Sequence, residues 1–312
     1  MGDLRDALIL SAGLGTRLRP LTLVRAKPAI PVGGVPMIRR SVAALAAQGI
    51  DRVVVNVHYL PHTIARVLGD GSDLGARVRY SWEQPEVLGS GGGPRLAATL
   101  LDADPFVIVN GDTLTDVDVH ALAAAHRASG ALVTLALTAN HDPSRYGGVA
   151  LDGTGAVTGF VRKGAQTGTS YHFVGVQIAS ADAFVDLVPG RPASTIGGLY
   201  DDLIAQRPGS IRGSIVEASF WDVGTVGDYW GTSLAFAGGD SGSTWRGRRV
   251  SIAATAQLRQ TIVWDDVDVA EGCSLDQCIV TDGVQVTEGS RYHRTILTAV
   301  GGDMVATPFD IP

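Results

Sequence analysis

Two short motifs near the N-terminus place phosphate-binding chemistry directly after a buried strand. The run from Ser11 to Thr22 reads SAGLGTRLRPLT, and its glycines allow backbone N–H groups to approach phosphate oxygens. Arg17 follows these glycines, where a guanidinium can hold the outer phosphates of a nucleotide through two hydrogen bonds. Taken alone, the same pattern is also that of an ordinary tight turn.

Two familiar phosphate loops are excluded by the spacing. A Walker loop needs GxxxxGK followed by Ser or Thr, and no such run occurs in the chain. A dinucleotide fingerprint needs a third glycine, but Leu18 stands in that place after Gly13 and Gly15. The sequence therefore argues against a Rossmann oxidoreductase that binds NAD.

The second motif is Lys27-Pro28 followed by Pro31-Val32, ten residues beyond Arg17. Proline fixes its own backbone φ, so these prolines are expected to hold Lys27 in a defined position. A solvated surface side chain is the commoner fate of a single lysine. Either motif alone is therefore weak evidence of a phosphate site.

The elements that must position these residues alternate between strands and helices. Continuous apolar runs predict strands buried on both faces, and a 3.6-residue spacing predicts helices between them. This alternation predicts a Rossmann-like α/β fold, a doubly wound mixed sheet that binds ligands beyond the carboxyl ends of its strands. The predicted strands are 7–11, 52–57, 77–82, 106–110 and 133–138, and the predicted helices are 36–48, 61–68, 94–101 and 119–127.

The chain changes character after the alternating region. Residues 149–151 and 156–161 flank the turn signal Asp152-Gly153-Thr154-Gly155, which predicts an antiparallel hairpin. Residues 237–243 read AGGDSGS, which is typical of a linker. We predict a catalytic domain over 1–236, a linker over 237–248 and a separate tail over 249–312.

The tail has an apolar period of six residues. Val263, Val269 and Leu275 stand six apart, and Val280 and Val286 repeat the step after one slip. This period predicts coils of a small parallel β-helix with three short faces per turn. An irregular β-structure is the alternative.

Composition excludes several classes of protein. The net charge is −6 and the 25 Lys and Arg residues are scattered, so no basic stripe for nucleic acid is present. No apolar run approaches the ~20 residues of a membrane helix. The N-terminal residues lead directly into a predicted strand, so we expect no signal peptide. Cys273 and Cys278 fit no zinc pattern and are expected to be buried thiols of a cytoplasmic protein.

Three segments together resemble the signature of the sugar-1-phosphate nucleotidyltransferases. These segments are GLGTRLRPLT over 13–22, KPAIPV over 27–32 and PMI over 36–38. The resemblance extends over roughly the first 235 residues. It implies an enzyme that joins a nucleoside triphosphate to a sugar 1-phosphate, uses Mg²⁺ and releases pyrophosphate. The tail is similar to the left-handed β-helix that several family members carry.

The resemblance also implies roles on the nucleotide side. The run LGSGG over 88–92 is similar to the loop that cradles the base, with Glu83 or Gln84 facing the base edge. The motifs that contain Asp112 and Asp222 are similar to two metal-ligand motifs, so that both aspartates share one Mg²⁺. The implied catalytic residues are Arg17, Lys27 and Asp112, and the implied nucleotide-binding residues are Ala12, Gly13, Gly15, Thr16, Gln84 and Gly89.

On the sugar side, the family pattern is altered. Lys163 ends a run similar to the F-x-E-K motif, in which this lysine holds the phosphate of the sugar 1-phosphate, but Arg162 replaces the usual glutamate. The run Phe173-Val174-Gly175 replaces the usual N-x-G. Both departures concern the identity of the sugar. The implied sugar-phosphate-binding residues are Tyr146, Gly147, Arg162, Lys163 and Gly175.

The implied reaction is an in-line displacement at the α-phosphorus. A phosphate oxygen of the sugar 1-phosphate is already ionised near neutral pH, so no general base is needed. The pattern favours GTP and a mannose- or heptose-like sugar, with uridylyl- and thymidylyltransferases of the same family as alternatives. A non-catalytic nucleotide-sugar-binding homologue and a hexapeptide acyltransferase using His293 are alternatives of other classes. The open strands of the tail predict a homo-oligomer.

Overall fold

The computed structural model describes residues 4–165, 170–236 and 244–311. The chain divides into two compact units. The first comprises Met1–Gly13, Arg40–Pro61 and Leu68–Trp221, and the second comprises Leu14–Arg39, His62–Val67 and Asp222–Pro312. Most of the predicted linker, residues 237–243, lies outside the described residues, and the predicted domain boundaries stay predictions.

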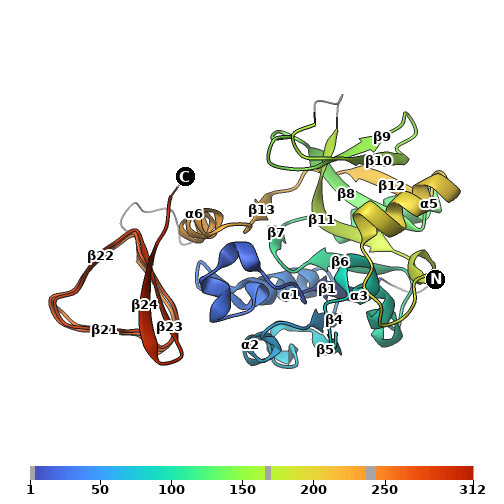
Figure 1. Cartoon of the computed structure of the whole chain (residues 1–312). Helices are drawn as coiled ribbons and strands as arrows, with labels where there is room; N and C mark the ends of the chain where they lie inside the picture. The colour runs from blue at the N-terminus through green and yellow to red at the C-terminus, as the bar shows by residue number, and fades with distance from the viewer. Residues whose placement is uncertain (1–3, 166–169, 237–243, 312) are drawn as a thin grey trace. The chain divides into compact units, whose positions relative to one another are not determined.

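The first unit is built on a nine-stranded sheet (Figure 1). β1 (Asp6–Leu10) is parallel to β4 (Arg52–Val57) on one side and to β6 (Phe106–Asn110) on the other, and β4 is parallel to β5 (Arg77–Trp82). The order of the strands therefore reverses at β1. In doubly wound sheets this reversal marks the edge at which ligands bind, beyond the carboxyl ends of the strands.

Antiparallel strands complete the sheet and make it mixed, as predicted. β11 (Tyr171–Ala179) is antiparallel to β6 and to β8 (Val133–Ala139), and β12 (Ile211–Ile215) is parallel to β8. β9 (Gly148–Leu151) and β10 (Val157–Val161) form the predicted antiparallel hairpin. Mixed α/β architecture with a largely parallel centre is thus confirmed.

Three of the four predicted helices occur close to their predicted limits, the fourth begins earlier, and α5 and α6 were not predicted. α4 begins after Asp118, whose carboxylate accepts the N–H groups of His120 and Ala121, and it ends at Gly130 in the left-handed conformation. The helix predicted over 94–101 instead begins at Gly89, inside the glycine run. The helices are α1 (Met37–Ala47), α2 (Pro61–Leu68), α3 (Gly89–Ala97), α4 (Val119–Ser129), α5 (Tyr200–Gln206) and α6 (Val226–Phe236).

The core of the first unit explains why the strands are almost continuously apolar. Leu8, Val54 and Ile108 come from the three central parallel strands and are almost fully buried in one cluster. Leu135 joins them from β8. Strands covered on both faces need apolar residues at every position, so alternation is absent from β1, β4 and β6. This rigid sheet holds the loops at its carboxyl edge.

The second unit contains the N-terminal turns and the tail. Three short 3₁₀ turns, η1 (Thr16–Leu18), η2 (Leu21–Leu23) and η3 (Lys27–Ala29), precede a small antiparallel ribbon of β2 (Pro31–Val32) and β3 (Val35–Pro36). In the tail, strands pair in parallel across three sheets, in the orders β14-β17-β20-β23, β15-β18-β21 and β16-β19-β22, with β24 antiparallel to β23. Figure 1 shows their labelled strands tracing a triangle.

The strands of the tail are short and recur regularly. They are β14 (Trp245–Arg246), β15 (Ser251–Ile252), β16 (Gln257–Arg259), β17 (Ile262–Val263), β18 (Asp268–Val269), β19 (Ser274–Asp276), β20 (Ile279–Val280), β21 (Gln285–Val286), β22 (Arg291–His293), β23 (Thr295–Val300) and β24 (Asp303–Pro308).

Successive coils of the tail are 17 residues apart, which explains the slip in the six-residue period. Two faces take six residues and one takes five, so Val263 pairs with Val280 and Val269 with Val286. These valines and Leu275 are buried in one cluster, and Cys273 and Cys278 are buried free thiols within it, as predicted. The arrangement is consistent with a β-helix.

The corners of the coils need left-handed backbone. Gly272 and Gly289 supply it at one corner without a side-chain clash. At another corner Gln260, Gln277 and Arg294 adopt positive φ, which costs roughly 1 kcal/mol for each residue with a Cβ. Hydrogen bonds between their side chains along the column, at 3.0 Å each, offset part of this cost.

Candidate active site

The carboxyl ends of β1, β4 and β6 lie together through hydrogen bonds that involve backbone groups. The N–H of Ser11 donates to Oδ1 of Asn56 at 2.5 Å, and the N–H of Gly111 donates to the carbonyl of Leu10 at 2.9 Å. A Cβ at Gly111 would lie 2.6 Å from that carbonyl oxygen, so only glycine fits there. Ala12 is buried just beyond β1 and Gly13 is exposed, which leaves the Gly13 backbone accessible.

Asn56 and Glu83 form a buried network beneath the glycine loop, residues 83–93. Nδ2 of Asn56 donates to Oε1 of Glu83 at 2.7 Å, and the N–H of Leu88 donates to Oε2 at 2.7 Å. Burial raises the pKa of Glu83, and these two hydrogen bonds oppose the rise. Of the two residues expected as alternatives at the base edge, Glu83 or Gln84, Glu83 is turned away from solvent, because its carboxylate is fully buried and bonds the loop from beneath. Gln84 is exposed.

The glycine loop continues directly into α3, contrary to the predicted helix start at Pro94. The N–H groups of Gly91 and Gly92 both donate to the carbonyl of Ala193, at 2.8 and 3.2 Å. A Cβ at Gly93 would lie 2.6 Å from Oε1 of Glu83. Glycine has a poor helix propensity, but here close packing and these hydrogen bonds outweigh it. Gly89, with φ of +74°, begins the helix.

Asp112 and Gly175 belong to the same edge of the sheet. Asp112 is half-buried and lies two residues beyond the end of β6. Gly175, with φ of +79°, lies in β11 opposite the end of β6, and a Cβ there would lie 3.0 Å from Nδ2 of Asn110 and from Oγ1 of Thr113. The structure thus brings Gly175 against the segment that carries Asp112.

The residues of the sugar side gather at the open end of the β9–β10 hairpin. Gly148 pairs with Val161, so Gly147 precedes the hairpin where Arg162 and Lys163 leave it. Arg162 and Lys163 are exposed. The register thus places Gly147, Arg162 and Lys163 at one end of the hairpin.

An aromatic cluster adjoins this end of the hairpin and was not predicted. The ring of Tyr146 lies 4.4 Å from that of His172, and Phe220 contacts both, at 5.8 and 4.7 Å. The guanidinium of Arg145 lies over Tyr146 at 5.1 Å. Burial lowers the pKa of His172, against a hydrogen bond to the Gly147 backbone, so a neutral imidazole is favoured here. Contacts of this kind depend on distant strands, and the sequence carries no local signal for them.

In the second unit, the phosphate loop and the Lys27 turn, residues 21–30, pack on one another. Oγ1 of Thr22 donates to the carbonyl of Gly15 at 3.0 Å. A Cβ at Gly15, which has φ of +62°, would lie 3.2 Å from Cβ of Lys27. Thr16 and Arg17 are exposed, whereas the Lys27 side chain is 8% exposed. The prediction that Lys27 is held in place agrees with this burial.

Asp222 is the last residue of β13 (Phe220–Asp222), and three residues separate it from α6. A Cβ at Gly224 would lie 3.0 Å from Oδ2 of Asp222 and 3.4 Å from Oδ2 of Asp228. Asp228 accepts the N–H and the hydroxyl of Thr225, at 2.9 and 2.8 Å, and so caps the helix. Asp222 and Asp112, from different units, are hard oxygen donors of the type that Mg²⁺ takes in small number beside waters and phosphates. Within 4–165, 170–236 and 244–311, no group of three or more His, Cys, Asp or Glu could hold a metal ion.

The chain matches the Nucleotidyl transferase family model over residues 6–237. It is 33% identical over 296 residues to a mannose-1-phosphate guanylyltransferase of Mycobacterium tuberculosis, and this match covers 86% of this chain and 82% of that protein. It is 34% identical over 226 residues to a mannose-1-phosphate guanyltransferase of Yarrowia lipolytica, and this match covers 71% of this chain and 61% of that protein.

Solved structures agree with these matches. HddC from Yersinia pseudotuberculosis has a TM-score of 0.65 and 27% identity, covering 75% of this chain and all of HddC. Its complex with GMP-PN has a TM-score of 0.64 at 24% identity, a likeness of fold alone. Among the described residues, no helix has the length and apolar character to cross a bilayer. The chain therefore belongs to the nucleotidyl transferase family and is, as its motifs predicted, a sugar-1-phosphate nucleotidyltransferase.

Proposed function

We propose that this enzyme transfers GMP from GTP to mannose 1-phosphate, forming GDP-mannose and pyrophosphate. The observation that carries the proposal is the 33% identity to the mycobacterial mannose-1-phosphate guanylyltransferase, which extends over most of both chains. A match of this length includes the tail as well as the sheet, whereas the fungal match covers 71% of this chain.

The proposed chemistry is a single displacement. A phosphate oxygen of the sugar 1-phosphate attacks the α-phosphorus of the triphosphate, the new P–O bond forms, and the bond to the pyrophosphate oxygen breaks. Backbone amides from Ala12 to Thr16 bind the phosphates and Arg17 holds the leaving pyrophosphate. Lys27, buried and fixed in its turn, stabilises the negative charge that develops at the α-phosphoryl group.

Asp112 and Asp222 are the proposed ligands of one Mg²⁺. When bound, this ion neutralises charge on the phosphates and helps to align them. Asp112 follows β6 and Asp222 ends β13, and the donor chemistry of both carboxylates suits the ion. The proposed role of the chain is to present these two oxygens while the remaining positions are left to water and phosphate.

The base and the sugar are assigned to separate loops. Gly89 and Gln84 are the proposed base contacts, and their support is the glycine loop that Glu83 and Asn56 hold in one conformation. Lys163 is proposed to bind the phosphate of the sugar 1-phosphate. The proposed sugar contacts are Tyr146, Gly147, Arg162 and Gly175.

Three further features belong to the proposal. The tail is proposed to be a left-handed β-helix, on the support of its three parallel ladders and its resemblance to family members. Two unpaired buried thiols support a reducing compartment, the cytoplasm. β24 stands at the edge of its sheet with Val305 exposed, and such an edge supports pairing with a second copy in a homo-oligomer.

The test is pyrophosphate release from each of five nucleoside triphosphates against a panel of sugar 1-phosphates, with and without Mg²⁺. We expect one strong pair, GTP with mannose 1-phosphate, and no release without the ion. A strong signal with UTP or dTTP would overturn the choice of base. Binding of GDP-mannose without turnover on any pair would instead identify a non-catalytic homologue.

A further inference from the structure

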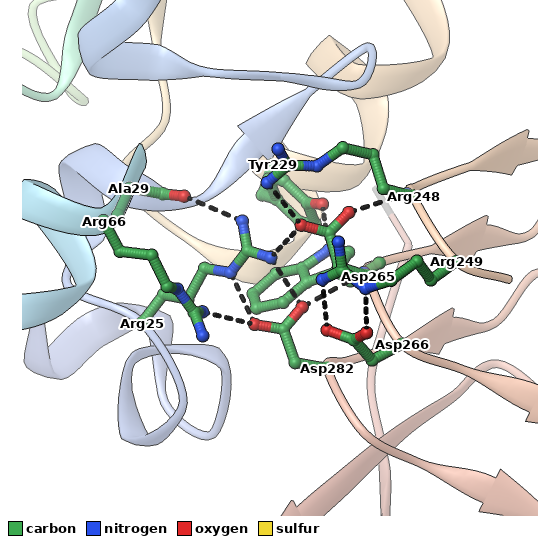
Figure 2. Close-up of polar contacts among 10 residues, drawn as sticks. Arg25, Ala29, Arg66, Tyr229, Arg248, Arg249, Asp265, Asp266 and Asp282 are labelled. Carbon is green, nitrogen blue, oxygen red and sulfur yellow. Dashed lines mark hydrogen bonds and ion pairs between the residues drawn. The ribbon is translucent and has the colours of Figure 1, made fainter. Parts of the chain in front are cut away.

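A buried ion-pair cluster joins the Lys27 turn to the tail. Nε and one terminal nitrogen of Arg25 donate to the two oxygens of Asp282, each at 2.6 Å, and the same terminal nitrogen donates to Asp265 at 2.9 Å (Figure 2). The Arg25 side chain is 2% exposed, and the two carboxylates are 14% and 16% exposed. A buried guanidinium needs such partners, because an unpaired one would cost several kcal/mol.

The two aspartates are stacked by the coil repeat. Asp265 and Asp282 stand 17 residues apart on adjacent coils, and the N–H of Asp265 donates to Oδ1 of Asp282 at 3.1 Å. On the coil before, Arg248 donates its N–H to Asp265 at 2.8 Å. Burial acts to raise the pKa of Asp265, but the Arg248 N–H and the Arg25 guanidinium lower it overall. The tail thus presents two carboxylates on adjacent coils to the single side chain of Arg25.

The same arginine is tied to the turn that carries Lys27. Its other terminal nitrogen donates to the carbonyl of Ala29 at 3.4 Å, and its backbone N–H donates to Leu21 at 3.3 Å. Lys27 lies within the segment that the Arg25–Ala29 bond closes, and a Cβ at Gly15 of the phosphate loop would lie 3.2 Å from the Lys27 Cβ. Arg25 thus contacts the turn on both sides of its own position, two residues before Lys27.

Trp264 connects the cluster to α6, the helix that follows Asp222. Arg25 lies over the Trp264 ring at 5.3 Å, and Nε1 of Trp264 donates to the hydroxyl of Tyr229 in α6 at 2.8 Å. Both aromatic side chains are fully buried. A second contact packs the tail against the loop between β2 and β3, since a Cβ at Gly34 would lie 2.0 Å from the ring of Trp245 in the first coil.

We infer that the tail positions the catalytic Lys27 turn by holding Arg25 through Asp265, Asp282 and Trp264. The coils then contribute to catalysis as well as to assembly. Arg25, Asp265, Asp282 and Trp264 are positioning residues, since they act through Lys27 and not on the substrate. The inference rests on the proposed function for its kinetic consequence. Its structural part, the hold of the tail on residues 14–30, is independent of the substrate.

The test compares Arg25→Lys and Asp282→Asn with the matched control Arg249→Gln in the full-length enzyme. Lysine keeps the charge but loses the planar fork, so it cannot reproduce the two-oxygen pair. Arg249 also pairs with an aspartate 17 residues on, Asp266, but at the surface. We expect Arg25→Lys and Asp282→Asn to lower kcat by about tenfold to a hundredfold with KM changed less than threefold, because small misplacement of a catalytic group is costly.

Amide hydrogen exchange over residues 14–30 is the second readout. We expect exchange there to be faster in Arg25→Lys and Asp282→Asn and unchanged in Arg249→Gln. Unchanged exchange in both cluster variants would overturn the inference, as would faster exchange with wild-type kcat. If the wild type turned over no substrate pair, the proposed function would fail, and the exchange result alone would decide the inference.

Discussion

Two loops of this enzyme are each held by a buried charged side chain, but the two side chains differ in the sign of their charge and in the kind of partner they have. The glycine loop rests on Glu83, a carboxylate whose hydrogen-bond donors are neutral, the Asn56 amide and the Leu88 N–H. The Lys27 turn rests on Arg25, a cation paired with Asp265 and Asp282. The glycine loop is thus held by one amide of β4 and one of the loop itself, and the Lys27 turn by charges from a distant part of the chain.

The difference matches what each loop is proposed to do. A loop that recognises a base needs a fixed backbone without a strong local charge, and neutral donors provide it. A turn that presents Lys27 to phosphates needs a neighbouring cation that is already neutralised, because an unpaired Arg25 would compete for the same phosphates. The comparison therefore predicts that damage to the Lys27 turn appears in kcat and damage to the glycine loop appears in KM.

The largest effect is expected for Lys27→Ala. Loss of a charge aimed at the transition state should lower kcat by about 100- to 1,000-fold, with KM for the nucleotide changed only a few-fold. Steady-state pyrophosphate release measures both constants. A variant that retains wild-type kcat would remove Lys27 from the mechanism and, with it, one side of the comparison.

Asp222→Asn is expected to act on the metal. Losing a ligand charge should raise the Mg²⁺ concentration for half-maximal activity by about tenfold or more, since even outer-shell changes cost this much. The control is Asp118→Asn, because this aspartate caps α4 and has no proposed metal role. An unchanged Mg²⁺ titration for Asp222→Asn would show that the ion is held elsewhere.

Asn56→Ala tests the neutral side of the comparison. It leaves the Ser11 N–H and a Glu83 oxygen buried without their partner, which should cost about 1–3 kcal/mol of unfolding free energy and raise KM for the nucleotide by about tenfold. Gln48→Ala is the matched control, since the Gln48 side-chain amide also makes several hydrogen bonds, with backbone groups of Ala44, Val117 and Val119, but none with the glycine loop. Equal KM effects in the two variants would contradict the assignment.

The contributions of Glu83 and Asp265 to the free energy of unfolding should change with pH in opposite directions. The pKa of Glu83 is raised by burial, so its contribution to the unfolding free energy is full below about 4.5 and decreases as pH rises through the folded-state pKa. The pKa of Asp265 is lowered by its partners against the effect of burial, so its contribution is full above about 3.8 and is lost as pH falls.

Urea unfolding of the wild type, Glu83→Gln and Asp265→Asn between pH 3 and 7 checks the signs. The free-energy difference between wild type and Glu83→Gln should shrink as pH rises, and the difference for Asp265→Asn should grow. If both free-energy differences changed with pH in the same direction, the pKa values of Glu83 and Asp265 would not be shifted in opposite directions.

The sequence by itself determined the sheet and most of its elements. The limits of strands 52–57, 77–82 and 106–110 and of helix 61–68 were predicted to the residue, because burial on both faces or on one stripe leaves a local apolar period. The phosphate motif and the family also followed from local spacing, since consecutive residues of one loop must serve one ligand.

Tertiary structure alone decided the helix start at Gly89 and the buried contacts of Glu83 and Arg25 that hold the two loops. The glycine run becomes helical because Ala193 and Glu83 pack against it, a contact that outweighs propensity. Arg25 meets Asp265 and Asp282 across 240 and 257 residues of chain. No local pattern encodes such a pair, because its partners become neighbours only after the coils have stacked and the turn has packed on them.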